Sequence, residues 1–215
     1  EQRLAHHRFP YLLVPEPERV LLVGAGAGND AAEALRNGAR QVDAVDIDPV
    51  ILSIGKALHP DRPYDSKRVR RILDDARAYF KNANGPYDVI VYARLDSHTL
   101  LSGFTNVRLD HYVYTRESFE EAKRLLKPDG VLVMSFVSME PWIQERLGQT
   151  LKTVFGQEPL HVRPFTLVVG SQARIQAALA CYPEFAAQAS ALPIPKGVRM
   201  TTDDWPYLYL KEPRV

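Results

Sequence analysis

Three glycines stand between an apolar run and a helical stretch. The segment VLLVGAGAGND places Gly24, Gly26 and Gly28 at this junction. Glycine lets the backbone turn sharply and approach a ligand, and the free amides at a helix N-terminus can donate hydrogen bonds to that ligand. We therefore predict a ligand cleft at this turn. Close packing of the helix on the strand is the alternative explanation of the same glycines.

The spacing of the glycines distinguishes between cofactors. A dinucleotide-binding turn has the pattern GxGxxG, and this chain carries Asn29 where the last glycine of that pattern would stand. The observed pattern, GxGxG, favours an adenosyl sulfonium such as S-adenosylmethionine over a nicotinamide cofactor.

Carboxylates end the next two predicted strands. Asp46 stands roughly 20 residues after the glycine turn, where a carboxylate can accept hydrogen bonds from both hydroxyls of a ribose. Asp74 and Asp75 follow the third strand at the same edge of the sheet, where an adenine amino group needs an acceptor. Asp75 can also cap the following helix, and the two roles are compatible. Asp48 is predicted to be a structural helix cap.

The acidic, aromatic end of the chain could bind a cation. The segment TTDDWPYLYL places Asp203 and Asp204 beside Trp205, and carboxylates with aromatic faces suit a cationic amine through charge pairing and cation–π contact. The alternative is structural, in which an aspartate caps a turn and Trp205 is anchored in the core.

Two other regions carry polar side chains. The connection from Asp96 to Val113 is predicted to be a mobile lid, and His98 within it is more typical of an exposed loop histidine than of a general base. His6 and His7 near the start are interpreted as a solvated face. No spacing of residues predicts a metal site.

Apolar runs that alternate with helical stretches predict the scaffold that positions these residues. Such alternation is typical of a parallel sheet covered by helices on both faces. Strands are expected at 19–23, 41–47, 69–73, 87–93, 131–137, 161–165 and 166–170. Helices are expected at 30–37, 49–58, 76–82, 116–126 and 142–155, with a turn at 127–130. The prediction is one α/β domain over residues 1–215, with a doubly wound, seven-stranded, mostly parallel sheet after a lead segment of residues 1–18.

Composition narrows the classes of function. Lys and Arg number 27 against 26 Asp and Glu, so no overall field favours a nucleic-acid partner. The single cysteine, Cys181, lies in the apolar run ALACY and is expected to be buried, and such cysteine usage fits a reducing, cytoplasmic compartment. No apolar stretch approaches the roughly 20 residues that span a bilayer.

Five segments follow one another in a characteristic order. RVLLVGAGAGND, VDAVDIDP, LDDARAYF, YDVIVYA and KPDGVLV succeed each other between about Arg19 and Phe136. This order resembles the spermidine synthase family, which has the Rossmann-like fold of the class I S-adenosylmethionine-dependent methyltransferases. NVRLDHYVYTRESF and TTDDWPYLYL are similar to a bacterial subgroup in which the domain often follows membrane-spanning segments. For such a protein the start at Glu1 would be a domain cut, and the location would be the cytosol or the cytosolic face of a membrane.

The resemblance implies roles for particular residues. Gly24, Ala25 and Gly26 would wrap the sulfonium end of S-adenosylmethionine or its decarboxylated form. Asp46 would hold the ribose, and Asp75 with Ala76 would meet the adenine. The full set of expected cofactor contacts is Gly24, Ala25, Gly26, Gly28, Asn29, Asp46, Ile47, Asp74, Asp75 and Ala76.

The chain departs from the family's pattern where the catalytic base is expected. True aminopropyltransferases carry D-S-S-D-P after strand four, its first Asp serving in deprotonating the amine, whereas residues 93–97 here read ARLDS. An alkylammonium must lose a proton before it can attack, so Ala93 argues against ordinary spermidine synthesis. Asp96 and Tyr92 are the catalytic candidates, and Asp203, Asp204 and Trp205 are the candidates for substrate binding. The glycine turn also carries Ala27 where the family usually has Asp.

Three hypotheses of function follow. The first is a transferase that moves an aminopropyl or methyl group to a small acceptor such as a polyamine. The second is a non-catalytic nucleoside-sensing or interaction domain that has lost the base. The third, a nicotinamide-dependent oxidoreductase, fits the glycine spacing least. A second copy of the chain is a candidate partner in a homodimer.

Overall fold

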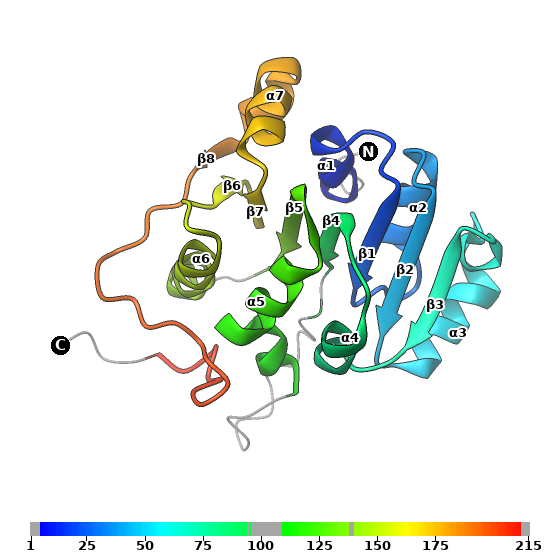
Figure 1. The fold of residues 1–215 in the computed structure, drawn as a ribbon, viewed down its shortest axis with the longest axis horizontal. Helices are drawn as coiled ribbons and strands as arrows, with labels where there is room; N and C mark the ends of the chain where they lie inside the picture. Colours follow the sequence, from blue (N-terminus) through cyan, green and yellow to red (C-terminus); the bar gives the residue numbers. More distant parts are fainter. Residues whose placement is uncertain (1–4, 94, 96–108, 138–139, 212–215) are drawn as a thin grey trace.

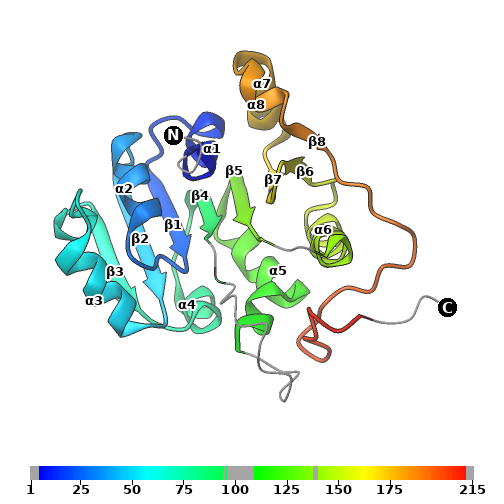
Figure 2. The ribbon, with the colours of Figure 1, turned by 180° about the vertical axis from the view of Figure 1, so that it is seen from behind.

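The computed structural model describes residues 5–93, 95, 109–137 and 140–211. Within these residues, one eight-stranded sheet has the order β3-β2-β1-β4-β5-β7-β6-β8 (Figures 1 and 2). The strands from β3 to β5 pair in parallel, and β7, β6 and β8 add to them in antiparallel pairs. The order reverses between β1 and β4, and ligands of such sheets bind where the carboxyl ends of the strands meet this reversal.

The elements have the following bounds. The strands are β1 (Arg19–Val23), β2 (Gln41–Asp46), β3 (Val69–Leu73), β4 (Tyr87–Tyr92), β5 (Leu126–Ser135), β6 (Leu160–Val162), β7 (Thr166–Gly170) and β8 (Ala189–Ala191). The helices are α1 (Ala5–Leu13), α2 (Asn29–Arg36), α3 (Pro49–Leu58), α4 (Ala76–Asn82), α5 (Arg116–Arg124), α6 (Pro141–Phe155), α7 (Gln172–Cys181) and α8 (Pro183–Ala186), with the 3₁₀ helices η2 (Pro63–Asp65) and η3 (Leu109–Tyr114).

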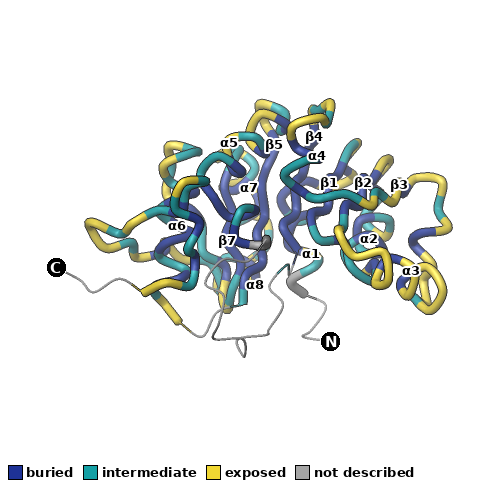
Figure 3. The backbone as a smooth tube through the Cα atoms, turned by 90° about the horizontal axis from the view of Figure 1, so that it is seen from below, coloured by how far each residue is buried: buried dark blue, intermediate teal, exposed yellow. Residues whose placement is uncertain are grey.

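Two hydrophobic cores lie on opposite faces of the sheet. Successive residues of β1 alternate between them, because side chains along a strand point to opposite faces. Val20 and Leu22 join the core beneath α1, α2 and α7, whereas Leu21 and Val23 join the core beneath α4, α5 and α6. Figure 3 shows the buried residues concentrated along the strands and the exposed ones at the outer loops. The helices therefore cover both faces, as predicted.

Local signals placed the starts of α3 and α4 correctly. The Asp48 carboxylate accepts hydrogen bonds from the amides of Val50 and Ile51, which makes Asp48 the N-cap of α3. Asp75 caps α4 in the same way, by accepting from the amides of Arg77 and Ala78. Both predicted caps are confirmed.

The far end of the sheet differs from the prediction. An eighth strand, β8, pairs with β6, so the prediction of seven strands is wrong. β8 contains only three residues, too few to show a period in the sequence. The helix α1 was also missed in the lead segment, because Pro10 inside it is a residue that usually interrupts helices.

Two smaller predictions are corrected. The turn expected at 127–130 lies within β5, and the pairing of β5 with β4 shifts register there instead of breaking. Cys181 is exposed at the end of α7, contrary to its predicted burial. Only Ile175 and Ala178 of α7 are buried, so the apolar run around Cys181 lies mostly outside the core.

No helix among the described residues is long and apolar enough to cross a membrane.

Candidate functional site

The glycine turn leads the chain from β1 into α2 through a series of left-handed conformations. The φ angles are 77° at Gly24, 54° at Gly26 and 101° at Gly28, and L side chains rarely adopt such values. The amides of Gly24 and Ala25 both donate to the carbonyl of Val45, at 2.9 and 3.0 Å, and this ties the turn to β2. Glycine is thus required here by backbone conformation.

Tyr64 of η2 holds the turn from its other side. Its buried hydroxyl donates to the carbonyl of Gly26 at 2.8 Å and to that of Ala25 at 3.2 Å. Burial is the main cause that raises the pKa of Tyr64, so the phenol stays protonated and remains a donor near neutral pH. Sequence reasoning missed this residue, because η2 is too short to give a periodic signal.

Asp46 faces the glycine turn from the end of β2. Its Oδ2 accepts a hydrogen bond from the amide of Gly26 at 2.7 Å, and its Oδ1 accepts one from the amide of Asp48 at 2.9 Å. The turn and the carboxylate that the sequence singled out therefore meet at one edge of the sheet. Backbone donors fix the position of the carboxylate.

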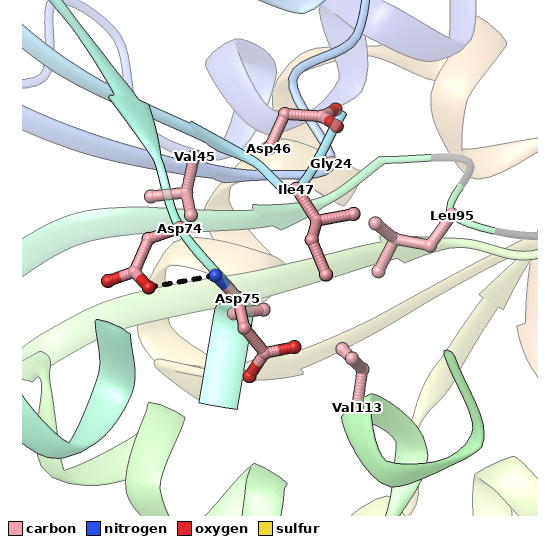
Figure 4. Close-up of a pocket in the computed structure, with 9 residues that line it drawn as sticks. Gly24, Val45, Asp46, Ile47, Asp74, Asp75, Leu95 and Val113 are labelled. Carbon is pink, nitrogen blue, oxygen red and sulfur yellow. Dashed lines mark hydrogen bonds between the residues drawn. The ribbon is translucent and has the colours of Figure 1, made fainter. Parts of the chain in front are cut away.

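A pocket of about 100 Å³, here called pocket A, opens beside Asp46. It is lined by Gly24, Val45, Asp46, Ile47, Asp74, Asp75, Ala76, Leu95 and Val113 (Figure 4). Figure 4 shows the carboxylates of Asp46 and Asp75 on opposite sides of Ile47. Ile47 is 57% exposed, which leaves a large apolar side chain available to cover a ligand. Sequence reasoning expected six of these residues but missed Val45, Leu95 and Val113, which approach only through the fold.

A second pocket of about 270 Å³, here called pocket B, lies past the glycine turn. It is lined by His7, Gly24, Ala25, Gly26, Ala27, Asn29, Asp30, Ala93 and Ser135. Gly24 lines both pockets, so they meet at the turn.

His7 was interpreted as part of a solvated face, but its side chain is only 14% exposed and its Nδ1 lies 2.6 Å from Oδ1 of Asp30. That interpretation is wrong, because α1 packs against α2 and carries His7 inward.

The acidic tail is anchored on α4 and α5. The guanidinium of Arg77 donates to Oδ2 of Asp203 at 2.7 Å, and the hydroxyl of Thr115 donates to its Oδ1 at the same distance. Asp204, in contrast, is exposed. In the described structure neither aspartate lines pocket A or B.

Trp205 is held between cationic side chains of the fold. The guanidinium carbons of Arg199 and Arg146 lie 3.9 and 4.9 Å from the centre of its ring. Arg146 also donates to the carbonyls of Tyr207 and Leu208, at 3.1 and 2.9 Å, and so fixes the tail against α6. These contacts support the structural interpretation of Trp205. Trp205 is also not among the described residues that line pocket A or pocket B.

The two catalytic candidates can be placed only in part. Tyr92 is fully buried at the end of β4, with its ring centre 5.3 Å from that of Phe119 and 6.4 Å from that of Tyr114. Burial is the main cause that raises its pKa, so its phenol is a poor base at neutral pH. Asp96 and His98 lie outside the described residues.

The fold and the paired pockets define the class of the protein. A mostly parallel sheet with a glycine turn after β1 and a carboxylate at the end of β2 is the class I methyltransferase type of Rossmann-like fold. Spermidine synthase from Thermotoga maritima superimposes with a TM-score of 0.66 at 15% identity, covering 97% of this chain and 72% of that one. Human methyltransferase-like protein 13 in complex with SAH gives a TM-score of 0.59 at 19% identity, covering 92% and 93%.

The sequence comparison gives the family. The spermine/spermidine synthase domain matches residues 2–179, and the chain belongs to this family, as its motifs predicted. It is 32% identical over 161 residues to the polyamine aminopropyltransferase of Vibrio vulnificus (strain CMCP6), or 69% of this chain and 50% of that protein. Polyamine aminopropyltransferase 2 of Hyperthermus butylicus is 28% identical over 167 residues, or 75% and 52%. The chain spans about half the length of these curated relatives.

Proposed function

We propose that this chain is an alkyltransferase that moves an aminopropyl group from decarboxylated S-adenosylmethionine to a small amine. Pockets A and B meet at Gly24, and this geometry carries the proposal. Adenosine in pocket A would place a sulfonium over the glycine turn, with its alkyl arm directed into pocket B. Family membership supports aminopropyl transfer over the other hypotheses.

The residues of pocket A fit the adenosyl group. Ile47 offers an apolar face for the adenine ring, and Asp75 offers an acceptor for its amino group. Asp46, already held by the amide of Gly26, can accept from the ribose hydroxyls. The missing Cβ of Gly24 allows close approach of the backbone where the two pockets join.

The reaction needs alignment more than charge stabilisation. When bound, the sulfonium supplies an electrophilic carbon, and attack on that carbon neutralises the positive charge. The task of the protein is to hold the donor and the acceptor in line, which is the contribution that fixed pockets make to a two-substrate reaction. The larger volume of pocket B leaves room for an amine beside the alkyl arm.

Calorimetric titration with three ligands tests the proposal. We expect binding of decarboxylated S-adenosylmethionine and of methylthioadenosine, with weaker binding of S-adenosylmethionine, whose carboxylate needs donors of its own. A preference for S-adenosylmethionine would favour methyl transfer. The absence of heat with all three would overturn the proposal. Binding without product from any amine would support the non-catalytic sensing domain.

Asp46→Ala is a companion test. Removal of the carboxylate should weaken binding of methylthioadenosine by about 1.5–3 kcal/mol, the scale for hydrogen bonds to a charged group. Asp48→Ser is the matched control, because serine retains the cap of α3 and Asp48 is exposed. Unchanged affinity in Asp46→Ala would remove Asp46 from the binding site.

A further inference from the structure

Pocket B contains a titratable pair that the proposed function has not used. His7 lies on α1 and Asp30 lies in the first turn of α2, on the other side of the glycine turn in sequence. Their Nδ1 and Oδ1 atoms are 2.6 Å apart, and each side chain is 14% exposed. This short contact between two mostly buried side chains is a charge-assisted hydrogen bond when the imidazole is protonated.

An amine acceptor makes a chemical demand on this pocket. Near neutral pH an aliphatic amine is an ammonium ion, which has no lone pair and must lose a proton before it attacks. Ala93, at the end of β4, offers only a methyl group to the pocket. Among the described residues that line pocket B, the side chains that carry a titratable group are those of His7 and Asp30.

We propose that His7, oriented by Asp30, is the catalytic base that takes the proton from the amine in pocket B. This inference rests on the proposed transferase function. Asp30 holds the ring through Nδ1, and its carboxylate stabilises the positive charge that the ring gains with the proton. The Asp30 carboxylate also attracts the cationic form of the acceptor to the pocket.

Proton loss accompanies the transfer of the alkyl group. The nitrogen of the amine forms a bond to the carbon beside the sulfonium, and the bond between that carbon and sulfur breaks with its electron pair left on sulfur. One proton passes from the nitrogen to His7 and then to water. The products are a longer amine and a neutral thioether.

Residues from several elements surround the pair of His7 and Asp30. Tyr11 on α1 is buried, and its pKa is raised by burial and then by the carboxylates of Asp30 and Glu33 on α2. Asn29 and Ser135 complete the polar lining of pocket B with neutral groups. The helix α7 and the strand β5 also pack against α1, and α7 contributes apolar side chains to the shared core.

The competing explanation is that the pair only ties α1 to α2. Two variants separate these roles, with decarboxylated S-adenosylmethionine and a panel of aliphatic diamines as substrates. His7→Asn should lower kcat by roughly 100-fold or more and change the pH–rate profile, because the proton acceptor is lost. Asp30→Asn keeps an acceptor for the ring but removes its charge. It should also lower kcat, by less than His7→Asn does, because the proton received by the ring loses its charged partner. Methylthioadenosine should bind both variants as it binds the unaltered protein.

A histidine at the far end of the sheet serves as the control. His161→Gln changes a histidine of β6, at the far end of the sheet, and should leave the pH–rate profile unchanged. If His7→Asn lowers only the thermal midpoint and keeps the rate and its pH dependence, the pair is structural and the inference is wrong while the transferase function stands. If the unaltered chain binds the adenosyl ligand but forms no product with any amine, both proposals fail. Should His7→Asn not fold, the loss of kcat in Asp30→Asn, at unchanged affinity for methylthioadenosine, decides the question.

Discussion

At the scale of single residues, Gly24 is the point where the two pockets meet. A Cβ added there would overlap the side chain of Leu95, and its φ of 77° already disfavours any other residue. We expect Gly24→Ala to lose about 1–2 kcal/mol of stability from the left-handed conformation alone. The displaced Leu95 should in addition weaken binding of methylthioadenosine by at least about tenfold, or 1.4 kcal/mol.

Gly156→Ala is a control that separates backbone strain from obstruction of the ligand pocket. Gly156 has a similar φ of 71°, at the end of α6, and a Cβ there would meet nothing within 4 Å. This variant should show the loss of stability without the loss of affinity, as measured by thermal unfolding and calorimetry. Equal affinities in the two variants would show that Gly24 does not border the ligand.

Asp75 combines two roles that substitution can separate. Asp75→Ser retains a side-chain oxygen for the cap of α4, whereas Asp75→Ala removes it and should cost about 1 kcal/mol of stability. If Asp75 also receives the adenine amino group, both variants should bind methylthioadenosine more weakly, although only the alanine variant unfolds more easily. Full affinity in the serine variant would leave Asp75 with the capping role alone.

At the scale of elements, an ion pair joins the tail to α4. Asp203→Asn weakens the contact with Arg77, whose side chain is 12% exposed, and should lower the free energy of unfolding by about 1–2 kcal/mol. Asp204→Asn is the matched control, because Asp204 is exposed. A raised KM for the amine in either variant, at unchanged stability, would instead support the role in substrate binding predicted from the sequence.

The sequence predicted most elements because their signals are local. β1 and β3 follow from runs of apolar and β-branched residues, and α3 follows from Asp48 with its first-turn proline, so these bounds are confirmed residue for residue. β8 and α1 were missed because a three-residue strand has no period and because Pro10 contradicts a helix. These elements form through tertiary contacts, which outweigh local preference.

At the scale of the whole molecule, pocket B explains why part of the site escaped prediction. Its lining extends in sequence from His7 to Ser135, and it closes only when α1 folds back against α2 and β5. Pocket A, in contrast, is built largely from the consecutive ends of β1, β2 and β3. Sequence motifs identify residues that share a strand end, but they do not show which distant helix completes the cavity.

The buried tyrosines predict how the molecule responds to alkali. Burial is the largest cause that raises the pKa of Tyr11, Tyr64, Tyr79, Tyr87 and Tyr92 above the usual value of about 10. A group whose pKa is higher in the folded state contributes stability below its unfolded pKa, and that stability is lost as pH rises towards the folded pKa. The free energy of unfolding should therefore fall above about pH 10.

Two optical signals check this expectation. Tyrosinate absorbance from the buried rings should appear together with the loss of far-ultraviolet circular dichroism, because these phenols ionise only as the fold opens. Ionisation of all the tyrosines before any loss of circular dichroism would contradict the burial of their hydroxyl groups.

The strand β3 forms one edge of the described sheet, and β8 forms the other. β3 contains five residues, and Arg70 and Arg71 at its middle are exposed. Two copies joined edge to edge along β3 would bring these guanidinium groups together, and short, charged edge strands are a common natural defence against amyloid-like growth. We therefore expect these arginines to disfavour edge-to-edge growth of the sheet.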